Sequence, residues 1–290
     1  MISSGVPISM EIIPEPEWEI LFNQLIEHTG ISVIMGSTDS GKSTLARYFT
    51  DRFISKSMKV CLVDSDVGQS SLGLPGTISM KVFAAEKDVE DFAFEKMSFV
   101  GTLNPAKSIA SVIESTERLS DLCREKSDTA LVDTSGLISG EAGKALKSAK
   151  VRALKPEHVI AIQRTDELEH ILKLIEVPEI YRIKVSRAAR MRSVITRTQY
   201  RKKKFENYFG RAGSSDFLLH TNEVRFLYGN KQFRPEEDLF KRGTLVGLNH
   251  DEDTIALAML EEITATSVTF RSPIKSIRKI NRILFSDIAC

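Results

Sequence analysis

The chain has 290 residues, of which 42% are hydrophobic and 27% charged, and this ordinary globular composition excludes a disordered chain. The length suits one large domain, or a core with a small appendix. Forty basic residues nearly cancel thirty-nine acidic residues and leave a net charge of +1. A uniformly basic nucleic-acid-binding protein is therefore excluded, whereas a local basic patch is not.

The cysteines and the N-terminus indicate the cellular setting. Cys61, Cys123 and Cys290 lack the spacing of a metal site, which argues against a zinc site or a disulfide scaffold and suits a reducing interior. The N-terminus has no signal-peptide pattern, and no apolar run reaches membrane length. We expect a soluble, cytoplasmic α/β protein that has no membrane partner.

Helices and short apolar strands alternate over the first 210 residues. An N-terminal arm and a helix over 17–29 make up residues 1–29, and a core follows over residues 30–210. The predicted strands of the core are Ile31–Met35, Lys59–Val63, Ser98–Gly101, Ala130–Val132, His158–Ile162 and Ile180–Val185. The predicted helices are Ser43–Lys56 and stretches near 106–126, 140–153 and 166–175. The alternation predicts a parallel sheet covered by helices on both faces.

The pattern changes at about residue 211, where short segments rich in β-forming residues begin. These segments are Phe217–His220, Val224–Tyr228, Thr244–Leu248, Thr254–Leu260 and Ser267–Phe270. Glycine, asparagine and aspartate separate them. The pattern predicts a small β-rich C-terminal domain over residues 211–290.

A phosphate-binding loop follows the first strand of the core. Residues 36–43 read GSTDSGKS and fit G-x-x-x-x-G-K-[ST] between a strand and a helix. Such a loop turns backbone N–H groups toward phosphates, while Lys42 reaches the β- and γ-phosphates and Ser43 can ligate Mg²⁺. The predicted nucleotide-binding residues are Gly36, Ser37, Thr38, Asp39, Ser40, Gly41, Lys42, Ser43 and Thr44. The loop alone does not distinguish a kinase from a GTPase or a motor.

Acidic residues follow two further strands. Asp64 and Asp66 stand where the second strand ends, and ligands of an open parallel sheet bind at such ends. One carboxylate near Mg²⁺ and one near an acceptor hydroxyl would suit phosphoryl transfer. Asp133, at the end of another apolar strand, either joins the Mg²⁺ shell or caps the next helix, and both interpretations stay open.

Residues 64–79, which read DSDVGQSSLGLPGTIS, resemble the signature of the polynucleotide 5′-hydroxyl-kinase family. Other stretches are similar to the same family, and the likeness runs from about Trp18 to the C-terminus. These stretches are Phe99–Thr102 with Asn104-Pro105, the nucleic-acid "clasp" Asp133–Gly136, the lid end Arg201–Phe209, and Gly247-Leu248 with Pro273-Ile274. The resemblance implies a P-loop core with a helical lid and a C-terminal β module.

The resemblance also implies a reaction, in which the γ-phosphate of ATP passes to the 5′-hydroxyl end of single-stranded RNA or DNA in the presence of Mg²⁺. Asp66 matches the residue that orients or deprotonates the hydroxyl, and Asp64 would act nearer the metal, although the two roles can be reversed. Gln69 would hold the metal's water shell or the phosphate. The residues implied to contact nucleic acid are Gln69 and the clasp residues Thr134, Ser135 and Gly136. The implied metal residues are Ser43, Asp64, Gln69 and Asp133.

Some features depart from the family pattern. Ser71 stands where many members carry an acid, and Leu137 stands where the clasp often continues into Trp. The N-terminal domain of the larger members is also not evident in the sequence. These departures leave substrate contacts, adenine recognition and protein partners unassigned.

A basic block spans residues 182–205, with ten Lys or Arg and no acid. Removing these ten charges from a chain of net charge +1 leaves −9, so the near-neutral total hides a basic strip on an acidic body. The strip is placed to serve as a lid (182–209) for a polyanion. Arg197 and Arg201, one helical turn apart, match the two lid arginines and would clamp the transferring phosphoryl group. Lys202, Lys203 and Lys204 are predicted to contact the nucleic-acid backbone.

Two other functions compete with the kinase. One is an ATP-binding scaffold of an RNA-processing complex that does not turn over, against which the intact Lys42, Asp66 and lid arginines argue. The other is a regulatory GTPase, which needs a guanine-reading segment such as N/T-K-x-D. Residues 163–166 read QRTD and lack that lysine. The sequence therefore favours the kinase.

Overall fold

The protein is described by a computed structural model, which covers residues 12–211, 213–229, 231–234 and 240–289. A parallel sheet lies at its centre, as predicted. Its strands, in spatial order, are β2 (Val60–Ser65), β5 (Thr129–Thr134), β1 (Ile31–Gly36), β6 (His158–Gln163) and β7 (Glu179–Lys184). All four neighbouring pairs are parallel, so the carboxyl ends of these strands meet at one edge.

The sheet extends beyond β2 through two further strands. β3 (Thr77–Phe83) is antiparallel to both β2 and β4 (Lys96–Phe99), so the sheet is mixed on this side. The sequence analysis did not predict β3. It follows directly after the glycine- and serine-rich stretch 68–76 without an intervening helix, and the βαβ alternation therefore gave no signal for it.

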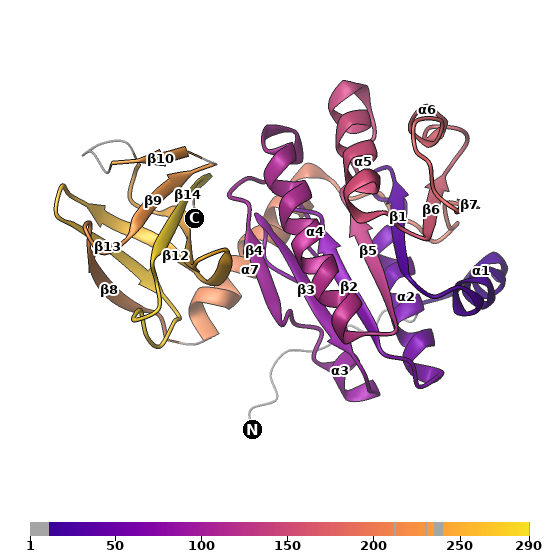
Figure 1. Ribbon diagram of the computed structural model, residues 1–290, viewed down its shortest axis with the longest axis horizontal. Coiled ribbons are helices and arrows are strands. Elements are labelled where there is room, and N and C mark those ends of the chain that lie inside the picture. The colour runs from indigo at the N-terminus through magenta and orange to yellow at the C-terminus, as the bar shows by residue number, and fades with distance from the viewer. Residues whose placement is uncertain (1–11, 212, 230, 235–239, 290) are drawn as a thin grey trace.

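Helices cover both faces of the core sheet (Figure 1). One face packs against α1 (Pro16–Glu27) and α2 (Lys42–Ser55), in a cluster that includes the buried Trp18. The other packs against α4 (Ile109–Lys126), α5 (Gly140–Leu154) and the short α6 (Glu169–Leu172). A short helix, α3 (Glu86–Glu90), lies between β3 and β4. In the described part of the chain, no helix combines the length and apolarity needed to cross a bilayer.

Within the described residues, seven strands follow the long helix α7 (Val194–Arg211) and form a second lobe with a hydrophobic cluster of its own (Figure 1). They are β8 (Ser215–His220), β9 (Arg225–Tyr228), β10 (Lys231–Phe233), β11 (Thr244–His250), β12 (Asp253–Ile263), β13 (Ser267–Ser272) and β14 (Arg282–Ala289). Most of their pairings are antiparallel. The β-rich C-terminal region is thus present. The predicted limits 29/30 and 210/211 stay predictions, and residues 1–11 of the predicted arm lie outside the described residues.

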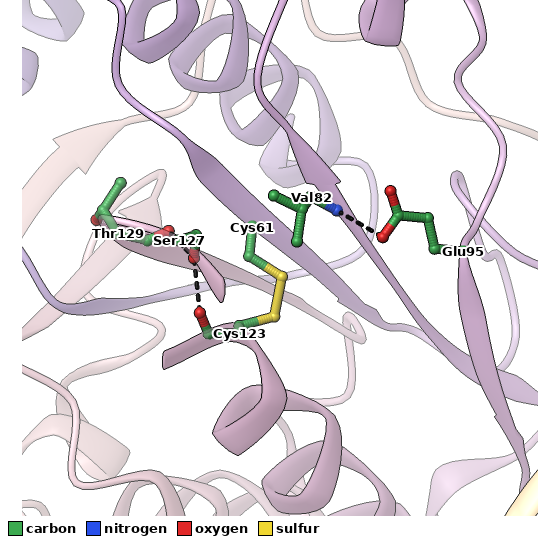
Figure 2. Close-up of a disulfide and its surroundings, with 6 residues drawn as sticks. All are labelled: Cys61, Val82, Glu95, Cys123, Ser127 and Thr129. Carbon is green, nitrogen blue, oxygen red and sulfur yellow. Dashed lines mark hydrogen bonds between the residues drawn. A yellow bond between two sulfur atoms is a disulfide. The ribbon is translucent and has the colours of Figure 1, made fainter. Parts of the chain in front are cut away.

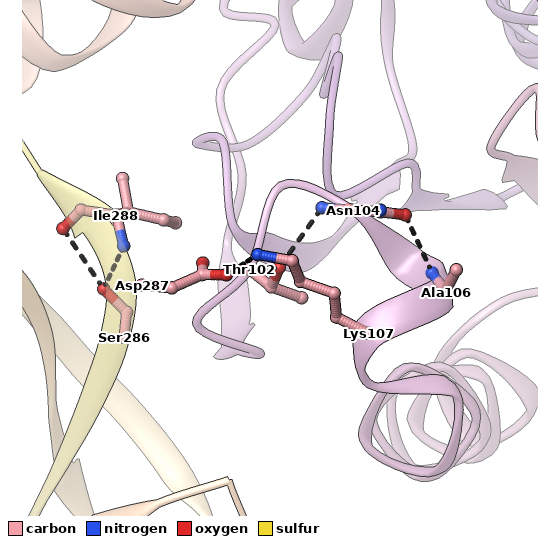
Figure 3. A network of polar contacts seen from close by, with 7 residues as sticks. All are labelled: Thr102, Asn104, Ala106, Lys107, Ser286, Asp287 and Ile288. Carbon is pink, nitrogen blue, oxygen red and sulfur yellow. Dashed lines mark hydrogen bonds and ion pairs between the residues drawn. The ribbon is translucent and has the colours of Figure 1, made fainter.

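The two lobes are joined by strand pairing and by polar contacts. β12 pairs with β4 through Thr254 and Met97, and this pairing makes one continuous sheet. Next to it, the Lys107 ammonium donates to Asp287 Oδ2 of β14 at 2.5 Å (Figure 3). Lys107 ends a turn of 3₁₀ helix that begins after Asn104, whose side chain accepts from the Ala106 N–H at 3.0 Å. The Asn104-Pro105 pair, which resembles that of the family, therefore begins the turn from which Lys107 contacts the C-terminal lobe.

A disulfide joins Cys61 of β2 to Cys123 of α4 (Figure 2). The expectation that the cysteines are unpaired is wrong for these two, while Cys290 lies outside the described residues. The cysteines are 62 residues apart and meet because α4 packs on β2, a contact that spacing in the sequence does not reveal. Both side chains are 0% exposed, so a reductant reaches the bond only after local opening.

Candidate active site

The phosphate loop lies between β1 and α2, as predicted. Gly41 has φ of +92°, a left-handed conformation that glycine adopts without strain, and it begins α2. A side chain at Gly36 would meet Ser40 Oγ at 2.3 Å, so the tight turn requires a glycine there. Lys42 is 6% exposed, and its ammonium donates to the Ser37 carbonyl at 2.6 Å. The lysine is therefore held within the loop that would cradle the phosphates.

Ser43 and Asp133 meet at the sheet edge. Ser43 Oγ donates to Asp133 Oδ2 at 2.5 Å, whereas Asp133 Oδ1 is buried and has no hydrogen-bond partner among the described residues. Burial raises the pKa of Asp133 to about 7; Asp64 raises it too, while Lys42 and Ser43 act in the opposite direction. A hydroxyl beside a carboxylate with an unused oxygen is a donor set that fits Mg²⁺. Of the two readings for Asp133, a metal-site role suits this contact better than a helix cap.

Asp64 organises the loop that follows β2. Its Oδ1 accepts from the Asp66 N–H at 3.1 Å, and its Oδ2 accepts from the Ser71 and Leu72 N–H groups at 2.5 and 2.9 Å. The hydroxyls of Ser70 and Ser71 donate to the same oxygen. The side chain is 0% exposed, and burial raises its pKa. The predicted metal role of Asp64 stays a prediction, and its contacts here are those of a loop anchor.

Asp66 lies two residues further along the loop and is partly exposed. Its Oδ1 accepts from the backbone N–H groups of Gly68 and Gln69 at 3.0 and 3.1 Å, and these bonds fix the carboxylate without using Oδ2. Gln69 Nε2 donates to the Gly68 carbonyl, and its buried Oε1 has no partner among the described residues. The arrangement leaves one oriented carboxylate and one amide oxygen for a ligand.

The predicted clasp lies directly against the phosphate loop. Asp133 and Thr134 of β5 are in register with Asp64 and Ser65 of β2. A Cβ at Gly136 would come within 2.4–2.6 Å of three Thr38 atoms, so only glycine allows this approach. Leu137, at the position where the family often has Trp, packs on the core. The clasp, the acidic loop and the phosphate loop therefore form one site.

Helix α7 brings the first lid arginine to the phosphate loop. Arg197 Nη2 donates to Asp39 Oδ2 at 2.6 Å, and the Arg192 N–H donates to the same oxygen at 2.9 Å. Asp39 has φ of +58°, so the loop is strained at the residue that holds the lid. Arg201 is not brought to the loop in this conformation, and it donates to Thr198 of its own helix.

The middle of α7 is fastened to the acidic loop. The Tyr200 hydroxyl donates to the Ser70 carbonyl at 2.9 Å, and burial raises the pKa of Tyr200 to about 12. The Lys204 ammonium donates to the carbonyls of Ser71 and Gly73 at 2.9 Å each. Lys202 and Lys203 are exposed, as contact with a nucleic-acid backbone requires. The predicted nucleic-acid contacts of all three lysines stay predictions, but Lys204 serves as a helix anchor here.

In the fold, acidic residues from outside the basic block 182–205 pair with some of its cations. Arg182 pairs with Glu169 at 2.8 Å, Arg197 with Asp39 at 2.6 Å, and Lys202 with Glu206 at 3.8 Å. These ion pairs neutralise part of the charge of the strip, which the sequence shows as ten cations without an acid.

The sequence analysis missed two lysines beneath the site. Lys147 and Lys150 of α5 are each 0% exposed. Lys147 Nζ donates to Thr134 Oγ1 at 2.7 Å and to the Ser135 carbonyl at 2.5 Å, and Lys150 Nζ donates to Ser65 Oγ. Burial lowers the pKa of Lys147 well below its usual range and that of Lys150 to about 8. The sequence signal was two lysines on the same helix face as Leu146, Val151 and Leu154.

Comparison with known proteins identifies the family. Residues 36–211 match the family described as mRNA cleavage and polyadenylation factor CLP1 P-loop. The chain belongs to this family. It is 34% identical over 215 residues to the polyribonucleotide 5′-hydroxyl-kinase PF0112 of Pyrococcus furiosus. The aligned region covers 71% of this chain and 58% of the relative. It is 33% identical over 252 residues to MJ1315 of Methanocaldococcus jannaschii, a protein with the same kinase name, which covers 82% and 69%.

The CLP1 P-loop assignment confirms the resemblance and the fold class. The structure of the wild-type Clp1p–Pcf11p (454–563) complex superposes with a TM-score of 0.77 over 94% of this chain and 79% of that chain, at 11% identity. At this identity the likeness supports the fold alone. The chain spans 58% of PF0112, little more than half of that relative. The family is a P-loop, ATP-binding family of RNA processing, and the two archaeal relatives are named as polyribonucleotide 5′-hydroxyl-kinases.

Proposed function

We propose that this CLP1 P-loop protein is an ATP-dependent polynucleotide 5′-hydroxyl kinase that phosphorylates the 5′-hydroxyl end of single-stranded RNA, and DNA as a second substrate. The proposal rests on one observation: the phosphate loop, Asp66 and the clasp lie together at one edge of the sheet. The kinase names of the archaeal relatives support RNA as the acceptor. We place the reaction inside the cell, where ATP and RNA are available.

In the proposed reaction the 5′-hydroxyl oxygen attacks the γ-phosphorus of ATP. A new P–O bond forms, the bond between the γ-phosphorus and the β,γ-bridging oxygen breaks, and ADP leaves. The hydroxyl proton passes to Asp66, whose Oδ1 is fixed by two N–H groups. Asp66 is a better base than Asp64, since Asp64 is fully buried and its two oxygens accept five hydrogen bonds from its own loop.

Cations around the loop would stabilise the transferring phosphoryl group. Lys42 would exchange the Ser37 carbonyl for a phosphate oxygen, and Arg197 would exchange Asp39 in the same way. Arg201 would turn toward the site as the lid closes. Ser43 and Asp133 would hold Mg²⁺, which supplies charge neutralisation on the β- and γ-phosphates. Lys202 and Lys203 would contact the backbone of the acceptor.

The test is transfer of label from γ-labelled ATP to 5′-hydroxyl oligonucleotides of RNA and DNA. We expect Asp66→Asn to lower kcat by about 100-fold or more while leaving ATP binding close to that of the wild type, because a general base contributes on this scale. Lys42→Ala should weaken both ATP binding and kcat.

Two controls accompany the assay. An oligonucleotide that already carries a 5′-phosphate should accept no label, and Lys56→Ala, an exposed change at the other end of α2, should behave like the wild type. Tight ATP binding without transfer to either polymer would contradict the kinase and favour an ATP-binding scaffold. A preference for GTP would instead favour the regulatory GTPase.

A further inference from the structure

Lys147 is a lysine at a fully buried position of α5. A buried amine is costly unless its hydrogen bonds are satisfied, and no salt bridge among the described residues includes Lys147. The same stripe of α5 presents Leu146, Val151 and Leu154 to the core, so an apolar residue would suit the position. The lysine is therefore placed for its contacts and not for the stability of the helix.

Within the described residues, the hydrogen bonds of the Lys147 amine are both with the clasp. Its Nζ donates to Thr134 Oγ1 and to the Ser135 carbonyl, and Thr134 Oγ1 in turn donates to the Ile34 carbonyl of β1 at 2.7 Å. The next residue, Gly136, touches Thr38 of the phosphate loop. One amine thus links α5, the end of β5 and, through Gly136, the nucleotide site.

The electrostatic surroundings place Lys147 under the reacting groups. Its charged neighbours are Lys150, Lys42, Asp66 and Asp133. Lys147 is 0% exposed, so its amine has no contact with bulk solvent. The buried Ser135 Oγ, beside the carbonyl that Lys147 holds, has no partner among the described residues and remains for a ligand.

We propose that Lys147 is a positioning residue, which holds Thr134 and Ser135 in the conformation that receives the acceptor end of the polynucleotide. The inference rests on the proposed kinase function. Loss of the amine leaves the Ser135 carbonyl and Thr134 hydroxyl without their buried donor, so the clasp shifts while the phosphate loop keeps its own hydrogen bonds.

The test separates the two substrates. Lys147→Met keeps length and apolar volume but removes the donor, and we expect KM for a 5′-hydroxyl RNA to rise about 10-fold or more with KM for ATP within about 2-fold. Lys150→Met is the matched comparison, since it removes an equally buried amine of the same helix that contacts Ser65 and not the clasp. Its effect should fall on the free energy of unfolding, with KM for RNA within about 2-fold of the wild type.

Thr134→Val supports the test if Lys147→Met fails to fold, because it removes the acceptor with little change of shape. It should raise KM for RNA in the same direction, and the double variant should be no worse than Lys147→Met alone. Equal changes in KM for RNA and ATP, or the same rise in KM for RNA in Lys150→Met, would overturn the proposal.

Binding measurements keep this proposal distinct from the kinase assignment. Fluorescence anisotropy of a labelled 5′-hydroxyl RNA gives Kd without turnover, and Lys147→Met should weaken RNA binding about 10-fold while ATP binding stays within about 2-fold. Wild-type protein that binds RNA but transfers no phosphate would contradict the kinase and leave the clasp role measurable. Wild-type protein that does not bind RNA would overturn both.

Discussion

Helices α5 and α7 bring cations to the same edge of the sheet in opposite ways. α7 carries its charges on a half-exposed face, where Arg197 and Lys204 make contacts with the loops around the site. α5 carries two lysines that are 0% exposed and make hydrogen bonds beneath those loops. A run of cations in a sequence therefore predicts a charged surface, whereas a buried cation shows only as a lysine among the core-facing residues of a helix.

The difference in burial implies different roles. The α7 contacts with Asp39, Ser70, Ser71 and Gly73 are polar and peripheral, and a ligand phosphate can replace the Asp39 carboxylate on Arg197. The α5 contacts are enclosed and change only if the core opens. We therefore expect substitutions in α7 to act on turnover and salt dependence, and Lys150 of α5 to act on stability.

The largest effect is expected for Arg197. Arg197→Ala should lower kcat of the proposed transfer by about 100-fold, because it removes a donor to the charge that develops on the phosphoryl group. Arg197→Lys keeps the charge but not the planar fork, and should recover only part of the loss. Arg152→Ala, an exposed change on α5, serves as the control. A kcat for Arg197→Ala above a third of the wild-type value would contradict the assignment.

The next effect concerns Lys150 and pH. Its pKa in the fold is about 8 and that of an unfolded lysine is about 10.5, so the unfolded chain binds more protons between these values. The free energy of unfolding should therefore rise with pH across this window, by at most about 1.4 kcal/mol per pH unit from this group. Lys147, whose pKa is lowered further, adds a rise in the same direction.

Urea unfolding between pH 7.5 and 9.5 measures this rise. The upper limit avoids Tyr48 and Tyr200, whose pKa values of about 12 make stability fall with pH once unfolded tyrosines ionise. Lys150→Met should remove a part of the slope, since burial also lowers the pKa values of Lys147, Lys42 and Lys204. Lys144→Met, a half-exposed change one turn or more away, should leave the slope as in the wild type. An unchanged slope in Lys150→Met would mean that Lys150 is not desolvated.

The periodic features of this chain were predictable from the sequence. The phosphate loop, the five parallel strands and the β-rich C-terminal region are encoded locally, by glycine spacing, short apolar runs and turn residues. β3 was missed because it returns antiparallel directly after the acidic loop, with no helix to mark it. The predicted helix 166–175 is four residues long in the fold, Glu169–Leu172.

Contacts between distant segments were not predictable. Nothing in the sequence pairs Cys61 with Cys123, or Arg197 with Asp39 across 158 residues. Asp64 and Asp66 read alike in the sequence, and only the fold shows one carboxylate enclosed by its loop and the other oriented at the edge. The departure at Ser71 is explained in part, because its N–H and hydroxyl both donate to Asp64.

The smallest effect separates the lysines of α7 from one another. Lys202 and Lys203 are exposed, whereas the Lys204 ammonium is held by two carbonyls. If the first two contact the acceptor backbone, the double change Lys202→Ala and Lys203→Ala should reduce the slope of log Kd against log salt for single-stranded RNA by about 1.4, or about 0.7 for each phosphate contact.

Lys204→Ala should leave that salt slope as in the wild type, since a lysine that contacts no phosphate releases no counterions. It should instead loosen α7 from the acidic loop, which is measurable as faster proteolysis within residues 194–211. An equal loss of slope in Lys204→Ala would show that the helix leaves Ser71 and Gly73 when RNA binds. In that case the exposed and the anchored cations of α7 act as one strip, and the contrast with the fixed lysines of α5 becomes larger.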